Sequence, residues 1–328
     1  MRVNLDHPAR GAVVRWLAPI LALTLWASDA IESLRLAALD RIRRIHPLRR
    51  RALFHGAVIG GSLGFLYLLL RGTDPFAWDA CSYWMVDLAS PYDNAWLLTP
   101  ETCGFFNYSP AAALLFAPLG WLPWPVFALG WTGLLLLALF WMGGRAALFM
   151  LAFPPIAGEI WTGNIHLLLA AAMVIGFRYP AAWAFVLLTK VTPGVGLVWF
   201  LVRREWRSLA IALGATVAVV AATWLVLPQQ WSTWLGLLQA NSGTVPELVP
   251  LWLRIGIAGL IIAWGASKNA PWTVPLGATI AVPVIYLISF AMLAACWPLR
   301  HGLPGHVKPA AAAAEPAVVS QDALLGRS

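Results

Sequence analysis

Residues 71–110, RGTDPFAWDACSYWMVDLASPYDNAWLLTPETCGFFNYSP, are the longest polar interruption in an otherwise apolar chain. An apolar run of 18 residues, Leu53 to Leu70, precedes this stretch, and more apolar sequence follows it. An acidic segment between two apolar runs is typical of a loop at a membrane surface. We expect this loop to contain the catalytic residue, Asp79. Five of the fourteen acidic residues lie here: Asp74, Asp79, Asp87, Asp93 and Glu101.

Composition places the chain among helical membrane proteins. Hydrophobic residues make up 60% of it and charged residues only 11%, whereas soluble domains carry about 25% charged residues. A spanning segment must satisfy its own backbone hydrogen bonds, and the short alternation typical of strands is absent from the sequence. We therefore expect an all-α polytopic membrane protein with about 8–10 transmembrane segments.

Charge is distributed unevenly along the chain. Residues 35–51 hold seven arginines against one aspartate, whereas residues 71–110 hold one arginine against five acids. A basic segment facing an acidic one across an apolar span is the positive-inside asymmetry, so residues 35–51 are expected in the cytoplasm and residues 71–110 outside. The net charge of +8 then indicates contact with anionic lipid headgroups and no nucleic-acid partner.

Three parts are expected. Residues 1–52 form a cytoplasmic or interfacial region, in which residues 28–45 have the pattern of an amphipathic helix lying on the membrane. Residues 53–298 form the transmembrane catalytic domain. Residues 299–328, rich in alanine and polar residues, form a disordered cytoplasmic tail.

Apolar segments divide the central domain. Residues 109–120 are too short and proline-broken for an ordinary span and are expected to form a juxtamembrane or re-entrant helix. Residues 228–250 are expected to form an outside loop, and residues 272–298, split by Pro283, can form a hairpin. The segments expected to run between the two faces are 53–70, 123–142, 146–161, 164–177, 208–227 and 251–266.

A second hairpin is expected around Lys190. Arg178 and Arg203 both look cytoplasmic but are separated by only 25 residues, so one straight helix would place them on opposite sides. Two short helices meeting at LLTKVTPG solve this problem, since the thirteen residues from Lys190 to Arg203 span about 20 Å of helix. Broken helices at membrane depth are tolerated where they line a cavity.

This topology gathers polar residues at the outer face, where each is a candidate because polar groups in membrane segments are costly. A carboxylate there can take a proton from an attacking hydroxyl, and cations can stabilise a phosphate that leaves. Asp79 and Tyr83, four apart, share a face if this part is helical. The candidates are Asp79, Tyr83, Asn107, Tyr108, Asn164, His166, Lys190 and Arg254.

Each candidate also has a simpler interpretation. Asp79 can be one solvated acid among five, and Lys190 and Arg254 can extend their stems to the interface. His166 can be a hydrogen-bonded core histidine. The Tyr108-Ser-Pro sequence can mark a helix start with proline in the first turn.

The three cysteines do not define a metal site. Cys81 and Cys103 share the acidic loop, where an oxidising compartment would permit a disulfide, and the sequence leaves this pairing open. Cys296 lies in an apolar segment and is expected to pack as a small core residue. The sequence has no metal-ligand spacing, so neither a metal nor another cofactor is expected.

The order of the motifs resembles a known family. WDACSYW follows the first span, then come Pro91-Tyr92, FNYSPAAALLFAPLGWLPWPVFALGW, GNIHLLLAA and LLTKVTPGVGLVWFLVRREWR. From about residue 75 to residue 265 this arrangement is similar to glycosyltransferase family 87 of the GT-C superfamily, whose members use polyprenyl-phosphate sugars. No single motif is specific, but their order and spacing are.

The resemblance implies juxtamembrane helices in the first outside loop and catalysis by an aspartate there, which corresponds to Asp79. Lys190 corresponds to the family's Lys-x-x-Pro position and is the first choice for the donor phosphate. The family usually has Gly-Gln-x-Asn where this chain has Gly163-Asn164-Ile165-His166, so the family's roles at this motif do not carry over directly to Asn164 and His166. Residues 272–298 contain no histidine or acid, so a late catalytic residue of relatives has no counterpart there.

The function expected is an inverting, metal-independent transfer of a sugar, most often mannose in this family. A polyprenyl-phosphate sugar would be the donor, and a lipid or glycan hydroxyl at the outer face of the cell membrane the acceptor. A transporter or flippase of a lipid-linked substrate is the alternative, because transporters also use broken helices with buried charges. A lipid-binding scaffold is a third interpretation.

Overall fold

The computed structural model describes His55 and residues 76–92, 103, 105–241 and 249–302. The chain divides into two units, Met1–Gly60 and Gly61–Ser328, and every helix named below belongs to the second. The expected amphipathic helix 28–45, nearly all of the expected span 53–70 and most of the expected tail lie outside the described residues. Where the structure describes the chain, all regular secondary structure is helical, which confirms the all-α fold.

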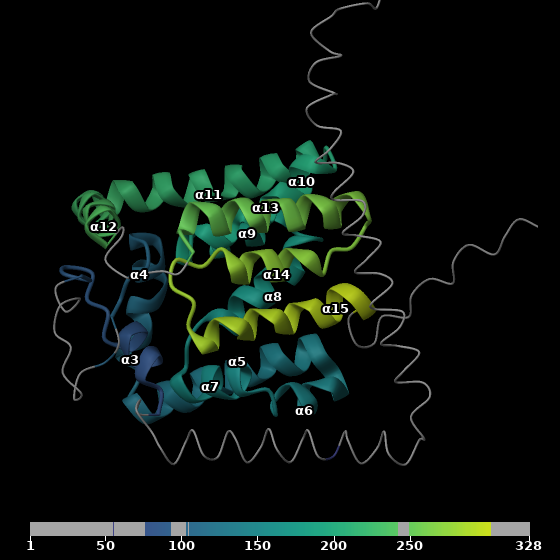
Figure 1. Ribbon diagram of the computed structural model, residues 1–328. Helices are drawn as coiled ribbons and strands as arrows, with labels where there is room; N and C mark the ends of the chain where they lie inside the picture. The colour runs from purple at the N-terminus through teal and green to yellow at the C-terminus, as the bar shows by residue number, and fades with distance from the viewer. Residues whose placement is uncertain (1–54, 56–75, 93–102, 104, 242–248, 303–328) are drawn as a thin grey trace, which may run out of the picture. The chain divides into compact units, whose positions relative to one another are not determined.

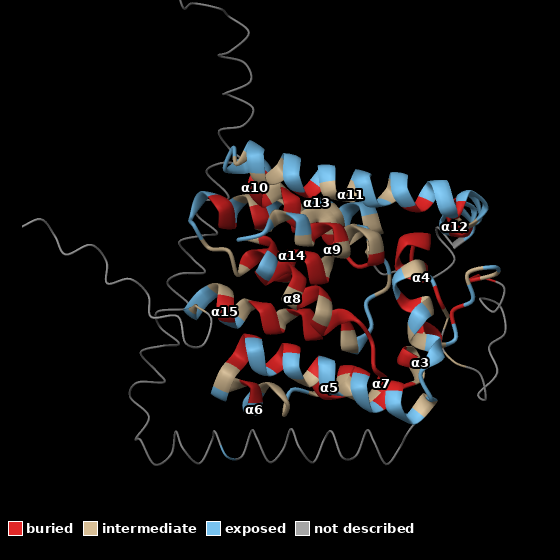
Figure 2. Cartoon of the chain, turned by 180° about the vertical axis from the view of Figure 1, so that it is seen from behind, coloured by how far each residue is buried: buried red, intermediate tan, exposed pale blue. Residues whose placement is uncertain are grey.

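Helix α8 (His166–Gly176) lies at the centre of the second unit. Its Leu167, Leu169 and Met173 side chains are fully buried, because α8 packs against α5 (Trp124–Gly143), α9 (Trp183–Thr189) and η6 (Leu287–Ala295). Figure 1 shows α8 between the layers formed by these neighbours, and Figure 2 shows it mostly as buried residues. The residues around the N-terminal end of α8 form the polar site described below.

Two long apolar helices face outward. Helix α11 (Trp206–Val226) buries only Ala212 and Thr223, and Figure 2 shows it exposed along its length. Trp124–Met150 and Trp206–Val226 are long and apolar enough to cross a membrane. A row of exposed apolar side chains on such helices suits contact with lipid, which agrees with a membrane protein.

The expected number of 8–10 transmembrane segments is not what the described residues show. They contain two helices that can span a membrane, or three if α7 (Pro154–Thr162) and α8, which meet at 109°, form one broken span. The other apolar segments are broken into shorter helices. The residues between 146 and 161, expected as one segment, are divided into α6 (Ala147–Met150) and α7, because Pro154-Pro155 begins a new helix and keeps Phe153 extended.

The hairpin expected around Lys190 is confirmed. Helix η4 (Pro180–Ala182) and α9 lead to Lys190, and η5 (Thr192–Leu197) and α10 (Val198–Val202) lead away from it. The two arms pack against each other, since the rings of Trp183 on α9 and Phe200 on α10 lie 6.3 Å apart. Lys190 therefore lies at the turn. Arg178 precedes the first arm and Arg203 ends the second, so both lie away from the turn.

A second hairpin follows α13 (Leu251–Ser267). Helix α14 (Thr273–Ile280) ends before a non-helical stretch, and η6 and α15 (Cys296–His301) return along it. The Cys296 thiol donates to the Trp272 carbonyl over 3.3 Å, which brings the two ends together. The expected break near Pro283 is confirmed.

Residues 228–241, expected within an outside loop, instead form α12 (Pro228–Asn241). Trp231 and Trp234 on this helix are buried, because the Trp234 indole donates to the Asn107 carbonyl over 3.2 Å. Both tryptophans thus pack against the protein. Glu247, in the same expected loop, lies outside the described residues.

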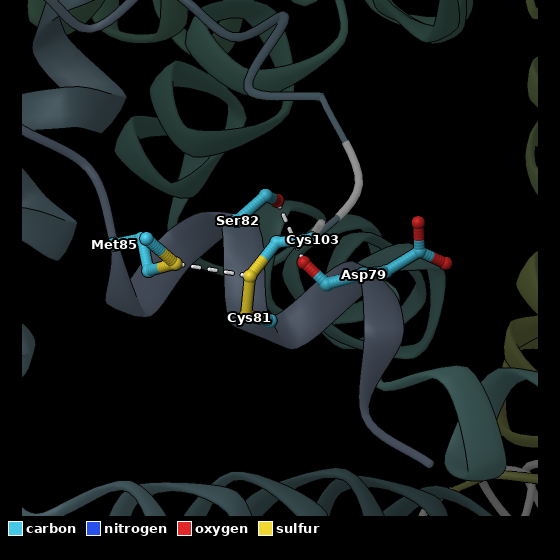
Figure 3. The surroundings of a disulfide bond; sticks show 5 residues. All are labelled: Asp79, Cys81, Ser82, Met85 and Cys103. Carbon is cyan, nitrogen blue, oxygen red and sulfur yellow. Dashed lines mark hydrogen bonds between the residues drawn. A yellow bond between two sulfur atoms is a disulfide. The ribbon is translucent and has the colours of Figure 1, made fainter. Parts of the chain in front are cut away.

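Helices α3 (Trp78–Trp84), α4 (Pro110–Phe116) and η2 (Ala117–Trp121) are the short helices expected near the first loop. Ser109 begins α4 by accepting from the Ala112 N–H over 3.4 Å, with Pro110 in the first turn, so the predicted helix start is confirmed. Figure 3 shows a disulfide between Cys81 on α3 and Cys103. This covalent link answers the question that the sequence left open.

The two ends of the second unit differ in charge. The Arg203 guanidinium donates to the Ala266 carbonyl over 3.4 Å and to the Asn269 side chain over 3.1 Å, so the ends of α10 and α13 meet. Figure 1 shows α10 and α15 at this end and α3, α4 and α12 at the opposite one. Among the described acids, Asp79, Asp87 and Glu159 belong to the end with α3. The other end carries Arg203, Lys268 and Arg300, and Glu205 is paired with Arg203 there.

Candidate functional site

Asp79 lies on α3, one residue into the helix. The Ala77 N–H donates to the Trp161 carbonyl of α7 over 2.8 Å, which fixes the start of α3 against α7. The Asp79 carboxylate accepts from the Asn164 side-chain amide over 2.8 Å. Figure 3 shows that this carboxylate points away from the disulfide on the same helix. The short helix thus presents Asp79 to the bend between α7 and α8.

The bend itself requires a glycine. Gly163 ends α7 with φ +73°, and a Cβ added there would come within 2.6 Å of the Ala80 Cβ. Its carbonyl accepts from the Trp131 indole over 2.7 Å. Asn164 follows, and its side-chain oxygen accepts from the Ile165 N–H over 2.7 Å. This bond fixes the orientation of the amide, so that its NH₂ group faces Asp79.

The pKa of the Asp79 carboxyl is raised above its ordinary value. Burial is the main cause, and the negative charge of Glu159 acts in the same direction. The Asn164 hydrogen bond and the positive charge of Lys190 oppose the shift, because both favour the ionised form. A carboxylate tuned in this way accepts a proton more readily than a solvated one.

Lys190 and His166 form a second pair beside this carboxylate. The Lys190 ammonium lies 2.7 Å from His166 Nε2, and His166 Nδ1 lies 2.9 Å from a Glu159 oxygen. The other Glu159 oxygen accepts from the Leu167 N–H over 3.1 Å. Glu159 and His166 are completely buried, so these contacts replace water as their partners.

The tyrosines connect α3 to α4. The Tyr83 and Tyr108 hydroxyls lie 2.9 Å apart, and the Tyr92 hydroxyl donates to the Tyr108 carbonyl over 2.9 Å. Burial raises the pKa of Tyr83, so both hydroxyls stay neutral. Tyr83 and Tyr108 therefore pack and hydrogen-bond to each other, and Tyr83 lies on the same helix as Asp79. Asn107 is exposed, and its backbone carbonyl is held by Trp234.

Arg254 is placed differently from the other candidates. Its guanidinium is buried and donates to the carbonyls of Val282 over 2.6 Å, Pro283 over 2.7 Å and Ile280 over 3.3 Å. A further bond reaches the Val249 carbonyl over 3.2 Å. Arg254 therefore does not extend to an interface; it binds the backbone where α14 ends, whose last carbonyls lack helical partners.

Glu159 is the site residue that the sequence analysis missed. It lies in the apolar stretch that was treated as a simple return segment. The available signal was an acid within a membrane segment, which marks a functional candidate by itself. Among the residues that the structure describes, no three His, Cys, Asp or Glu side chains are grouped to hold a metal ion.

Comparison with known proteins gives a family and one distant relative. The model of glycosyltransferase family 87 matches residues 105–320, a range that includes Asn164, His166 and Lys190 but not Asp79. A polyprenol-phosphate-mannose-dependent alpha-(1-2)-phosphatidylinositol pentamannoside mannosyltransferase from Mycolicibacterium smegmatis is 29% identical over 154 residues, which cover 40% of this chain and 38% of the relative. The matched region thus spans well under half of that protein. No solved structure matches the chain.

The family match extends over most of the described helices, from the residues before α4 to the end of the second hairpin. It includes the bend with Asn164 and His166 and the hairpin with Lys190. The helical fold, the apolar outer helices and this match agree with one another. The chain belongs to glycosyltransferase family 87.

Proposed function

We propose that this glycosyltransferase moves a sugar, mannose in the first instance, from a polyprenyl-phosphate donor to an acceptor hydroxyl at the outer face of the cell membrane. The observation that carries this proposal is the bend between α7 and α8. Asn164 of the bend holds Asp79, and His166, two residues later, contacts Lys190. Two residues of this bend thus contact a carboxylate and a cation. The mannosyltransferase named above supports the choice of sugar.

The charges at this bend suit a single displacement. As the acceptor hydroxyl attacks the sugar carbon, its proton passes to the Asp79 carboxylate. The bond from that carbon to the phosphate oxygen breaks, and its electron pair stays on the polyprenyl phosphate. Negative charge thus leaves Asp79 and appears on the phosphate, so one displacement with inversion requires no second carboxylate as nucleophile.

Lys190 is the proposed ligand of the donor phosphate. It lies at the turn of the hairpin, and an ammonium there stabilises the charge that develops on the leaving phosphate. His166 contacts Lys190 and can assist it, whereas Arg254 is bound to backbone carbonyls. The geometry therefore favours His166 over Arg254 as the companion of Lys190.

The proposal includes an orientation for the membrane. The end with α3 and Asp79 would face outward, and the end with Arg203 and Lys268 would face the cytoplasm, as the positive-inside rule favours. Residues 53–298 would form the catalytic domain, with residues 1–52 and 299–328 on the cytoplasmic side. The chain would cross the cell membrane several times.

Reconstitution tests the function. The purified protein in liposomes receives labelled polyprenyl-phosphate-mannose and a glycolipid acceptor, and the expected product carries a new glycosidic bond of inverted configuration. Movement of the label across the bilayer without a new bond would instead support the flippase alternative. No observation in the described residues favours that alternative.

Thiol labelling tests the orientation. Cys81 and Cys103 are bonded to each other, and Cys296 is the remaining cysteine, so a Cys296→Ala background has no free thiol. A cysteine at the exposed position Asp87 should react with an impermeant reagent on intact cells. One at Arg204 should react only after lysis, and the reverse pattern would overturn the orientation.

A further inference from the structure

The contact between Glu159 and His166 has a chemical consequence for Lys190. An ionised carboxylate can only accept hydrogen bonds, and an ammonium can only donate them. The Lys190 ammonium lies 2.7 Å from Nε2, so Nε2 accepts from it, and the proton of a neutral ring lies on Nδ1, which donates to Glu159 over 2.9 Å. The two neighbours together select one neutral tautomer of His166.

We propose that Glu159 is a positioning residue that fixes His166 in its Nδ1–H tautomer, so that Nε2 holds the Lys190 ammonium ready for the donor phosphate. This inference rests on the proposed function, because it assigns Lys190 to the donor. Glu159 does not touch substrate in this arrangement. It acts through His166, and His166 acts through Lys190.

Burial makes the arrangement stiff. Glu159 and His166 are fully buried, and the second Glu159 oxygen is bound by the Leu167 N–H at the start of α8. The carboxylate therefore has a fixed orientation, and the imidazole plane follows from it. A lysine stem is flexible, so an acceptor in a fixed position limits where its ammonium lies.

The order of events follows from this geometry. Before the donor arrives, His166 Nε2 occupies one of the three donor hydrogens of Lys190. Among the described residues the ammonium makes no further hydrogen bond, so its remaining hydrogens can meet the incoming phosphate oxygens. When the phosphate gains charge as the sugar leaves, the ammonium is already in place, and no reorganisation is needed at that moment.

Glu159→Gln is the informative substitution because it keeps the shape of the side chain. Its amide oxygen can still accept from the Leu167 N–H, while its NH₂ group faces His166 Nδ1. A donor at this position forces the ring into the Nε2–H tautomer, which presents N–H to the Lys190 ammonium. The variant should therefore fold and misplace Lys190.

The tautomer is measured directly by NMR of protein labelled with ¹⁵N-histidine, in which the signal of His166 is identified by its loss in His166→Gln. We expect the Nδ1–H tautomer in the wild type and the Nε2–H tautomer in Glu159→Gln. A wild-type ring protonated at Nε2, or a signal that Glu159→Gln leaves unchanged, would overturn the assignment.

Kinetics measure the consequence. Glu159→Gln should raise the donor KM and lower kcat/KM on the order of 10-fold, as when the partner that orients a ligating histidine is lost. In a Lys190→Met background the same substitution should have no further effect. Glu205→Gln, which removes a carboxylate from a partly exposed pair with Arg203, is the matched control and should leave the donor KM unchanged.

Two results separate this inference from the proposed function. The expected tautomers in a wild type that transfers no sugar would refute the proposed function and leave the positioning contact supported. Full transfer by a folded Glu159→Gln variant would refute the positioning role alone. If Glu159→Gln does not fold, two His166 variants replace it. His166→Gln retains an acceptor for Lys190, whereas His166→Phe does not. Equal donor KM values in these two variants would also refute the positioning role.

Discussion

Lys190 and Arg254 are two cations inside the same helical unit, and their surroundings differ. Arg254 donates to three backbone carbonyls where α14 ends and to the Val249 carbonyl before α13, whereas Lys190 contacts His166 at the turn of a hairpin. A guanidinium that donates to several backbone carbonyls stabilises the fold. An ammonium whose N–H groups are not all bonded within the described residues can bind a ligand. The environment of a buried charge, more than its presence, therefore indicates its role.

Asp79→Asn is the substitution with the largest expected effect, since it tests whether the Lys190 region is catalytic at all. Turnover should fall by on the order of 10² to 10⁴, the usual contribution of general acid–base catalysis. Donor binding should remain nearly intact, because the base acts on the acceptor hydroxyl during the reaction. Turnover is measured in liposomes, and binding is measured separately.

Asp87→Asn is the matched control for this experiment, because Asp87 is an exposed acid at the same end of the molecule. It should retain turnover. Full activity of Asp79→Asn would show that the Asp79 carboxylate is structural and that the region around Lys190 is not the catalytic site.

Arg254→Met tests the structural side of the comparison. It leaves several carbonyls without their donor, and each buried unsatisfied group costs about 1–3 kcal/mol. We expect a loss of about 3 kcal/mol in the free energy of unfolding, which denaturant titration in detergent would measure. The folded fraction should bind donor normally, whereas weakened donor binding with unchanged stability would make Arg254 a phosphate ligand.

Lys190→Met tests the other side and keeps much of the stem while it removes the charge. Donor binding should weaken by about 1.5–3 kcal/mol, as for a hydrogen bond to a charged group. Stability should change less than in Arg254→Met. Unchanged donor affinity in the folded variant would remove the distinction between the two cations.

The smallest expected effect is a shift in pH dependence. The pKa of Asp79 is raised chiefly by burial, so turnover should be lost on acidification at a higher pH than for a solvated aspartate. Asn164→Ala removes a bond that favours the carboxylate, and it should move this loss to still higher pH. A shift in the opposite direction would show that Asn164 does not stabilise the charged form.

Stability should follow the same pKa shift with a definite sign. A carboxyl whose pKa is raised on folding stabilises the protein below its ordinary pKa, and this contribution is lost as pH rises through the raised pKa. The stability of Asp79→Asn relative to the wild type should therefore increase with pH over that window. Thermal unfolding across pH would measure it.

Part of this comparison could be predicted from the sequence. The charges at Arg178 and Arg203 are too close for one span, which correctly predicted the hairpin with Lys190 at its turn. The long helices α5 and α11 follow from uninterrupted apolar runs. The family resemblance implied short helices in the first outside loop, and Asp79 lies on one of them, α3, although its role stays a prediction.

The rest depends on contacts between distant residues. The partners of Arg254 lie 26–29 residues further along the chain, so no local pattern separates a structural arginine from a phosphate ligand. The 109° angle between α7 and α8 arises from a glycine whose conformation and close approach to Ala80 are visible only in three dimensions. The sequence analysis expected separate segments on either side of this bend, 146–161 and 164–177, but it treated the first as a plain apolar span, so Glu159 was missed.

Helix α11 sets a length scale for the whole unit. Its 21 residues extend about 31 Å, close to the thickness of the hydrocarbon layer of a typical bilayer. Because only two of its residues are buried, a thinner bilayer would be accommodated by tilting this helix. Helix α12 begins two residues after α11 ends and is tied through Trp234 to the backbone before α4. Hydrophobic mismatch at α11 would therefore be transmitted to the end of the molecule that carries Asp79, which makes acyl-chain length of the host lipid a variable that activity should follow.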